Sequence, residues 1–330
     1  MNWKKRSVFV LSLLALFVLS SVVSFASGAN SKPVTIKLVT PFKQGHIIAD
    51  ASEAFKILIE EKTNGRIKVD LYQGYGSEIS CSKECSEGTV DMQWAGGQPI
   101  QDFAPQYFFF NAPFVIKDYD HFERVWDSRL GNECRKQIEK NGNMLCFSTL
   151  YRGFRQTTAN QAINGPADLA KLRLRLPLVP DWVTVWQALG ATPVQYPLDQ
   201  LYTVLKTGSA EASEGDLAQI ASYKLTEVQS RLIMTDHLVA VGWSTANKQF
   251  FRNLSAQDQE LIAKYIEQAA AWATLKTKLD EGRYLSQLKA AGMTVIIPDA
   301  NAIRAKATPA VEGLFKKQYP VTTWAEVLSI

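Results

Sequence analysis

The sequence has 330 residues, of which 46% are hydrophobic, and a formal charge of +4. Its Lys and Arg residues form no clustered stripe, so a nucleic-acid-binding protein is not expected. About 300 residues exceed the usual size of one hydrophobic core, and two domains are therefore expected.

An export signal is predicted at residues 1–29. Three basic residues precede an apolar run over positions 8–23, and small residues follow. This segment holds three of the 36 Lys and Arg and none of the 32 Asp and Glu, so the rest carries a charge of +1. No later segment approaches the roughly 20 apolar residues of a membrane helix. The protein is expected in the periplasm.

The four cysteines favour disulfides, because exported proteins meet an oxidising environment. The simplest pairing joins Cys81 to Cys85 and Cys134 to Cys146, although four cysteines allow three connectivities and the sequence does not choose among them. Spacings of four and twelve residues are poor zinc patterns. We expect no metal and no cofactor.

The first elements follow a β-α-β order. Residues 34–39 alternate in polarity like a strand, 51–61 have helical spacing, and 66–72 alternate again. A short helix over 82–88 and a buried strand over 89–94 follow. This order predicts an α/β protein with parallel sheets flanked by helices.

Two later segments stand out. Residues 168–172 look helical and precede a strand over 173–176. Ser255 can cap a helix whose apolar pattern runs to Leu285, roughly 45 Å at about 1.5 Å per residue. Such a helix can span two lobes. The alternative is two shorter helices broken at Gly282.

Two arginines are the main candidates for a binding site. Arg175 lies within the apolar strand 173–176, where a guanidinium is costly unless it pairs with a carboxylate or similar oxyanion. The alternative is an internal salt bridge with Glu214 or Asp216. Arg155 is either a second ligand contact or a surface charge.

Several segments resemble one family. They are Gly-Phe-Arg-Gln-Thr-Thr-Ala-Asn and Ala-Asp-Leu-Ala-Lys-Leu-Arg-Leu-Arg-Leu-Pro within residues 151–177, Trp-Gln-Ala-Leu-Gly-Ala-Thr-Pro at 186–193, Leu-Tyr-Thr-Val-Leu-Lys-Thr-Gly at 201–208, and Leu-Ser-Ala-Gln-Asp-Gln-Glu at 254–260. In this order and spacing they resemble the solute receptors of tripartite ATP-independent periplasmic (TRAP) transporters. The similarity covers essentially the whole chain after the signal.

The resemblance implies a two-lobed periplasmic binding protein fold. Two α/β lobes would be joined by crossing strands and a long helix that spans both, with the ligand in the cleft between them. Lobe I would hold residues 30–152 and 241–280, and lobe II residues 153–240 and 281–330. A ligand that bridges both lobes is expected to shift the protein from an open to a closed form.

The implied function is capture of a small organic anion. The receptor, expected to be a monomer, would deliver it to the small and large membrane subunits of a TRAP transporter for ion-gradient-driven uptake, and would catalyse nothing. The residue content agrees, since none of the three histidines lies beside a Ser or Cys nucleophile. Alternative ligands are a small sulfonate or an amino or keto acid. An alternative role is to present the ligand to a membrane sensor kinase.

The resemblance also implies roles for single residues. Arg175 matches the family's carboxylate clamp, and Arg155 matches an arginine that often assists. Glu214 matches the acid of a Glu-Asn pair, but Gly215 stands where Asn is common. The pocket should therefore be roomier there, or should contact the ligand through backbone.

Aromatic residues and His46 complete the candidates. Trp94, Trp182 and Trp243 lie near predicted strand ends, and each is either core or cleft. Together with Gly215 they favour an aromatic or other monocarboxylate. His46 follows a strand and is either a cleft residue or a capping or core residue. An amino-acid ligand would need an acid for its ammonium group, with Glu214, Asp216 and Glu211 as the candidates.

Overall fold

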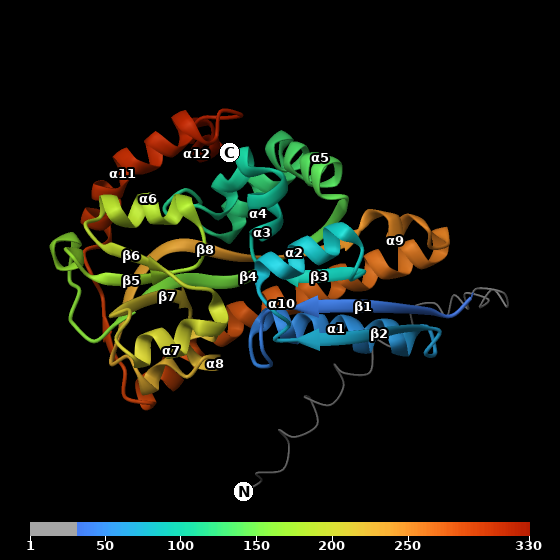
Figure 1. Ribbon diagram of the computed structural model, residues 1–330, viewed down its shortest axis with the longest axis horizontal. Helices are drawn as coiled ribbons and strands as arrows, with labels where there is room; N and C mark the ends of the chain where they lie inside the picture. The colour runs from blue at the N-terminus through green and yellow to red at the C-terminus, as the bar shows by residue number, and fades with distance from the viewer. Residues whose placement is uncertain (1–31) are drawn as a thin grey trace, which may run out of the picture. The chain divides into compact units, whose positions relative to one another are not determined.

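The computed structural model describes residues 32–330, so the predicted export signal lies outside the described residues (Figure 1). The strands are β1 (Val34–Thr40), β2 (Ile67–Gln73), β3 (Met92–Ala95), β4 (Met144–Ala159), β5 (Arg173–Leu176), β6 (Thr192–Gln195), β7 (Ala212–Asp216), β8 (Arg231–Asn247) and β9 (Thr294–Ile296). The α-helices are α1 (Ile47–Lys62), α2 (Glu78–Glu87), α3 (Gln98–Phe103), α4 (Tyr119–Asp127), α5 (Arg129–Gly142), α6 (Pro180–Ala188), α7 (Leu201–Lys206), α8 (Leu217–Ser222), α9 (Lys248–Arg252), α10 (Ala256–Ala290), α11 (Ala300–Lys317) and α12 (Trp324–Ser329).

The strands of the described chain form one mixed sheet in the order β2-β1-β3-β8-β4-β7-β5-β6, with β9 against β8. The outer strands pair in parallel, as the β-α-β pattern predicts, at β1 with β2 and β3 and at β5 with β6 and β7. The central pairs, β3 with β8, β8 with β4 and β4 with β7, are antiparallel. The predicted parallel pairing is therefore correct for the outer strands and wrong for the central pairs, because the two central strands run between the lobes instead of following a helical crossover.

The two central strands are shared by both lobes. β4 has 16 residues and β8 has 17, about three times the length of an ordinary strand. The end of β8 pairs with β3, whereas the end of β4 pairs with β7. The α/β class, the crossing strands and the two-lobed architecture are thus as predicted. The exact lobe boundaries, residues 30–152 with 241–280 and 153–240 with 281–330, remain a prediction.

The long helix is a single element. α10 has 35 residues, or roughly 50 Å at about 1.5 Å per residue. Ser255 caps it by accepting a hydrogen bond at Oγ from the Asp258 backbone amide, and the helix continues through Gly282. It packs against α1 near its start and against α8 further along. The alternative of two shorter helices is wrong. None of the helices described here is both long and apolar enough to cross a bilayer.

Local chemistry shifts some element boundaries. α1 begins four residues before the predicted range because His46 caps it, its Nδ1 accepting from the Ile48 amide at 3.1 Å. β3 begins three residues late, since the Asp91 carboxylate just before it accepts from the Lys37 amide at 2.7 Å. The helical pattern at 168–172 is a short 3-10 turn over Pro166–Leu169.

The predicted disulfides are absent, since all four cysteines are free thiols. Cys81 and Cys85 lie one turn apart in α2, where Cβ atoms are about 5–6 Å apart, too far for the 3.5–4.5 Å of a disulfide. Cys134 and Cys146 are separate thiols within and beside the apolar core. Burial raises the pKa of Cys146 to about 12 and that of Cys134 well above its ordinary value. All four act as small apolar side chains.

Candidate functional site

A cavity opens where the carboxyl ends of β3, β5 and β7 meet β4, the usual place for a ligand in an α/β protein. Its walls come from Phe42, Glu78, Gly96, Gly97, Gln98, Gln101, Phe108, Asn111, Arg152, Arg155, Arg175, Pro177, Val179, Trp182, Leu198, Gln219 and Ala240. The cavity has a volume of about 50 Å³. Three of these residues are arginines, so the cavity is suited to an anion.

Arg175 is held in the strand but leaves part of its guanidinium free. Its neighbours Leu174 and Leu176 are fully buried, which fixes β5 in the core, and Arg175 itself is only 1% exposed. Its Nε donates to the Tyr196 carbonyl at 2.9 Å, while Nη2 is buried with no partner in the part of the chain described. Burial lowers the pKa of Arg175 to about 10, so it remains charged at neutral pH.

Arg155 is paired with protein rather than free. Its Nη2 donates to Glu214 Oε1 at 2.8 Å, and its Nε also bonds to that carboxylate. The guanidinium lies over the Trp182 ring at 5.0 Å. Although burial acts in the opposite direction, Arg155 and a contact from His237 at 3.3 Å lower the pKa of Glu214 to about 2. Glu214 therefore forms its ion pair with Arg155 and not with Arg175.

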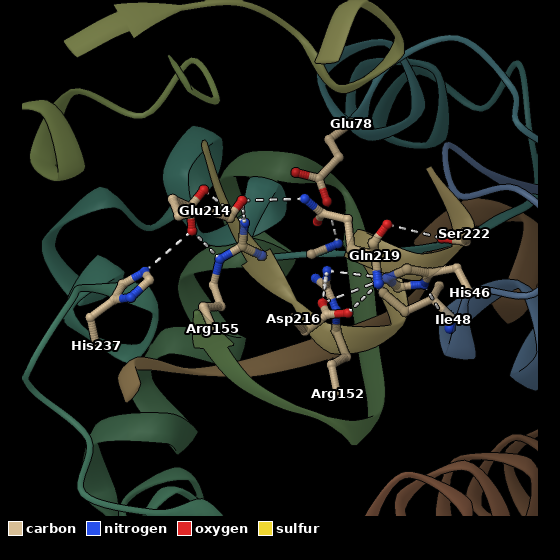
Figure 2. Close-up of polar contacts among 11 residues, drawn as sticks. His46, Ile48, Glu78, Arg152, Arg155, Glu214, Asp216, Gln219, Ser222 and His237 are labelled. Atoms are coloured by element: carbon tan, nitrogen blue, oxygen red, sulfur yellow. Dashed lines mark hydrogen bonds and ion pairs between the residues drawn. The ribbon is translucent and has the colours of Figure 1, made fainter. Parts of the chain in front are cut away.

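Arg152 is a third arginine that the sequence did not predict. Its Nη2 donates to Asp216 Oδ2 at 2.8 Å and lies 3.3 Å from His46 Nε2 (Figure 2). Burial raises the pKa of the Asp216 carboxyl, but Arg152, His46 and Arg155 together outweigh burial and lower that pKa, so the carboxylate is ionised. Asp216 Oδ1 also accepts a hydrogen bond from the backbone amide of Gln219 at 2.8 Å and thereby caps α8.

A β-bulge explains why Arg152 escaped prediction. Residues three apart in a regular strand point to opposite faces, so Arg152 and Arg155 are not expected to share a site. The β4 register shifts between Tyr151 and Gly153, and Gly153 has a positive φ of 96°. The extra residue reverses the alternation, and both arginines then line one cavity. Only the glycine at 153 signals this in the sequence.

Two charged side chains of the cavity lack an opposite partner within residues 32–330. Arg152 and Arg155 form ion pairs with Asp216 and Glu214. Arg175 and Glu78 form none, and Glu78 uses one oxygen to accept from the Gly96 amide at 2.7 Å. The unpaired charges of the wall are therefore one cation and one anion. Neither Glu78 nor Gln219 has a sequence pattern that marks it, because each follows a turn at the start of a short helix.

Of the other candidates, Trp182 lines the cavity and donates from Nε1 to the Asn111 carbonyl at 2.6 Å. Trp94 and Trp243 lie in the core instead. Trp94 packs on Phe55, whereas Trp243 packs on aromatic rings of α4 on the opposite face of the sheet.

The structure places His46, Gly215 and the remaining acids as follows. His46 is the α1 cap beneath the cavity, buried and stacked on Phe42 at 4.0 Å. Gly215 lies in β7 beside Gln219. Glu211 pairs with Arg173 near the surface. No group of three or more His, Cys, Asp and Glu that could hold a metal ion occurs between residues 32 and 330.

The lowered pKa values of the three histidines lead us to expect a loss of stability in acid. Burial lowers the pKa of His46 from 6.5 to about 4 and lowers those of His121 and His237. The unfolded chain therefore binds more protons between about pH 6.5 and 4, so the free energy of unfolding falls as pH falls through this range. A pKa that differs by one between the folded and unfolded chain changes this free energy by about 1.4 kcal/mol.

Urea unfolding at pH 7.5, 5.5 and 4.5 measures this effect. His46→Asn keeps a capping side chain but does not titrate, so its loss between pH 7.5 and 4.5 should be smaller than in the wild type. An equal loss in both proteins would contradict the role given to His46.

Comparison with known proteins identifies the family. Residues 39–318 match the family described as bacterial extracellular solute-binding protein, family 7. A solute-binding protein of Roseobacter denitrificans is 30% identical over 300 residues, which cover 87% of this chain and 88% of the relative. The sialic acid-binding periplasmic protein of Vibrio cholerae is 26% identical over 289 residues, covering 87% and 90%.

Solved structures agree. A TRAP periplasmic solute-binding protein of Roseobacter denitrificans with bound L-galactonate superposes with a TM-score of 0.84 at 26% identity, covering 91% of this chain and 100% of that one. The family consists of binding proteins. The chain thus belongs to family 7 of the bacterial extracellular solute-binding proteins and is a periplasmic solute receptor of the TRAP transporter type.

Proposed function

We propose that this receptor captures a monocarboxylate by its carboxylate group, with Arg175 as the clamp, and delivers it to the small and large membrane subunits of a TRAP transporter. One observation carries the proposal: Arg175 is buried, charged and only partly bonded, and it faces a cavity. A planar guanidinium suits a carboxylate, which can accept two parallel hydrogen bonds. Relatives that bind L-galactonate and sialic acid support an organic-acid ligand.

The charges of the wall favour one carboxylate over two. Arg152 and Arg155 are already neutralised by buried acids, which leaves Arg175 to balance a ligand charge. A second ligand carboxylate would have no free cation and would meet Glu78. Like charges brought together in a desolvated site repel strongly.

The apolar part of the wall does not select aromatic ligands by itself. Trp182, Phe42 and Phe108 line the cavity, but Arg155 covers one face of the Trp182 ring and Arg152 covers the Phe42 ring. An aromatic monocarboxylate remains one candidate among others.

A thermal-shift panel tests the ligand class. We expect monocarboxylates to raise the melting temperature, because a ligand at 100 times its Kd stabilises the folded state by about 2.7 kcal/mol. Matched dicarboxylates, sulfonates and amino acids should have smaller effects, and benzoate measures the aromatic option. Stabilisation by dicarboxylates or sulfonates alone would contradict a single-carboxylate site, and no stabilisation by any acid would contradict the proposed function.

A further inference from the structure

Gly215 leaves space that a neighbouring side chain fills. It lies in β7 and has no positive φ, so its backbone does not require glycine. A Cβ at this position would lie 2.5 Å from Nε2 and 3.0 Å from Cδ of Gln219, closer than real atoms approach. The missing side chain therefore makes room for the Gln219 carboxamide.

Gln219 brings that carboxamide into the cavity. It follows the Asp216 cap in α8, is 2% exposed and forms part of the cavity wall. Its Nε2 makes one long bond, 3.4 Å, to the Glu214 carbonyl, and its Oε1 has no partner within the described chain. Figure 2 shows the side chain between Glu214 and Glu78. A buried amide with this much unused capacity is costly unless a ligand completes it.

Glu78 supplies the complementary group. It comes from the start of α2, and one of its carboxylate oxygens holds the Gly96 amide. An ionised carboxylate only accepts hydrogen bonds, whereas a carboxamide both donates and accepts. A ligand hydroxyl matches this pair, because it can donate to Glu78 and accept from Gln219 Nε2. An ammonium group can only donate hydrogen bonds. It would leave Gln219 Nε2 with only its long bond to the Glu214 carbonyl.

We propose that Gln219 and Glu78 form a second subsite that selects monocarboxylates carrying a hydroxyl group, and that Gly215 is what allows Gln219 to take this position. The inference rests on the proposed function, since Arg175 must hold the carboxylate in the same cavity. Gln219 is then a specificity-determining residue, and its effect should depend on the hydroxyl of the ligand.

Calorimetry with matched acids tests the subsite. The pairs are D-erythronate with butanoate and D-gluconate with hexanoate, which differ in their hydroxyls at equal chain length. The wild type should bind the hydroxylated acid of a pair at least tenfold more tightly. Gln219→Met keeps the volume but removes the amide, so it should lose about tenfold for the hydroxylated acid and nothing for the plain one.

Gly215→Ala provides an independent variant. Its added methyl group displaces the Gln219 carboxamide without changing Gln219, so the ratio between the two acids should fall in the same way. Thermal unfolding confirms that each variant is folded. If a variant does not fold, the ratio of the wild-type affinities for the two acids of a pair still tests the subsite.

Several results would overturn the inference. Equal affinity of the wild type for both acids of a pair would remove the subsite, and so would an equal loss for both acids in Gln219→Met, which indicates a packing role. Tighter binding of 2-aminobutanoate than of D-erythronate would assign the subsite to an ammonium group. These outcomes leave the proposed function intact, whereas failure of the wild type to bind any acid of the panel contradicts the proposed function itself.

Discussion

Arg175→Ala should reduce ligand affinity by roughly thirty- to several-thousand-fold, because truncating one member of a buried charge pair costs about 2–5 kcal/mol. The fold should persist, since the guanidinium makes a single hydrogen bond to protein among the described residues. Calorimetry with the best acid of the panel measures the loss, and circular dichroism checks the fold.

Two variants sharpen this test. Arg175→Lys keeps a positive charge but loses the planar fork, so its affinity should lie between those of wild type and Arg175→Ala. Arg173→Ala removes another arginine of β5, one whose side chain is 48% exposed and paired with Glu211. Its affinity should match the wild type. Unchanged binding in Arg175→Ala, or equal losses in Arg173→Ala and Arg175→Ala, would remove the clamp.

Glu214→Ala should cost about 3–5 kcal/mol of folding free energy, because it leaves Arg155 charged and unpaired in a buried site. Urea unfolding at pH 7.5 measures the change. The double variant Arg155→Met with Glu214→Leu removes both charges and should be much closer to wild type than the two single losses added together.

An exposed pair serves as the control for that cycle. Glu211→Ala breaks a contact to Arg173 in which both side chains are about half exposed, so it should change stability by about 0–1 kcal/mol. A cost for Glu214→Ala no larger than for Glu211→Ala would show that burial does not strengthen the Arg155 pair.

The sequence predicted those features that depend on local pattern. Helical spacing and the Ser255 cap indicated the long helix, and an arginine inside an apolar strand pointed to Arg175. Its unpaired state was not predictable, because Glu214 and Asp216 were equally plausible partners. In the structure these two acids form ion pairs with Arg155 and Arg152 instead.

Other features depend on the direction in which side chains point and could not be predicted from the sequence. The bulge beside Gly153 turns Arg152 into the cavity, and no alternation of polarity reveals it. Trp94 and Trp243 end in the core because proximity to a strand end does not fix the face on which a ring lies. The resemblance marked Gly215 as unusual, but only the packing of Gln219 against it explains why.

The shared strands also constrain how the receptor can move. β4 and β8 are hydrogen-bonded to each other along most of their length. The two halves of the sheet are therefore joined by paired strands and not by a flexible linker. Any opening must bend a continuous ladder, and irregular points such as the one beside Gly153 are where bending breaks the fewest hydrogen bonds. Rotation about a single axis is then favoured over sliding or free tumbling of one half against the other.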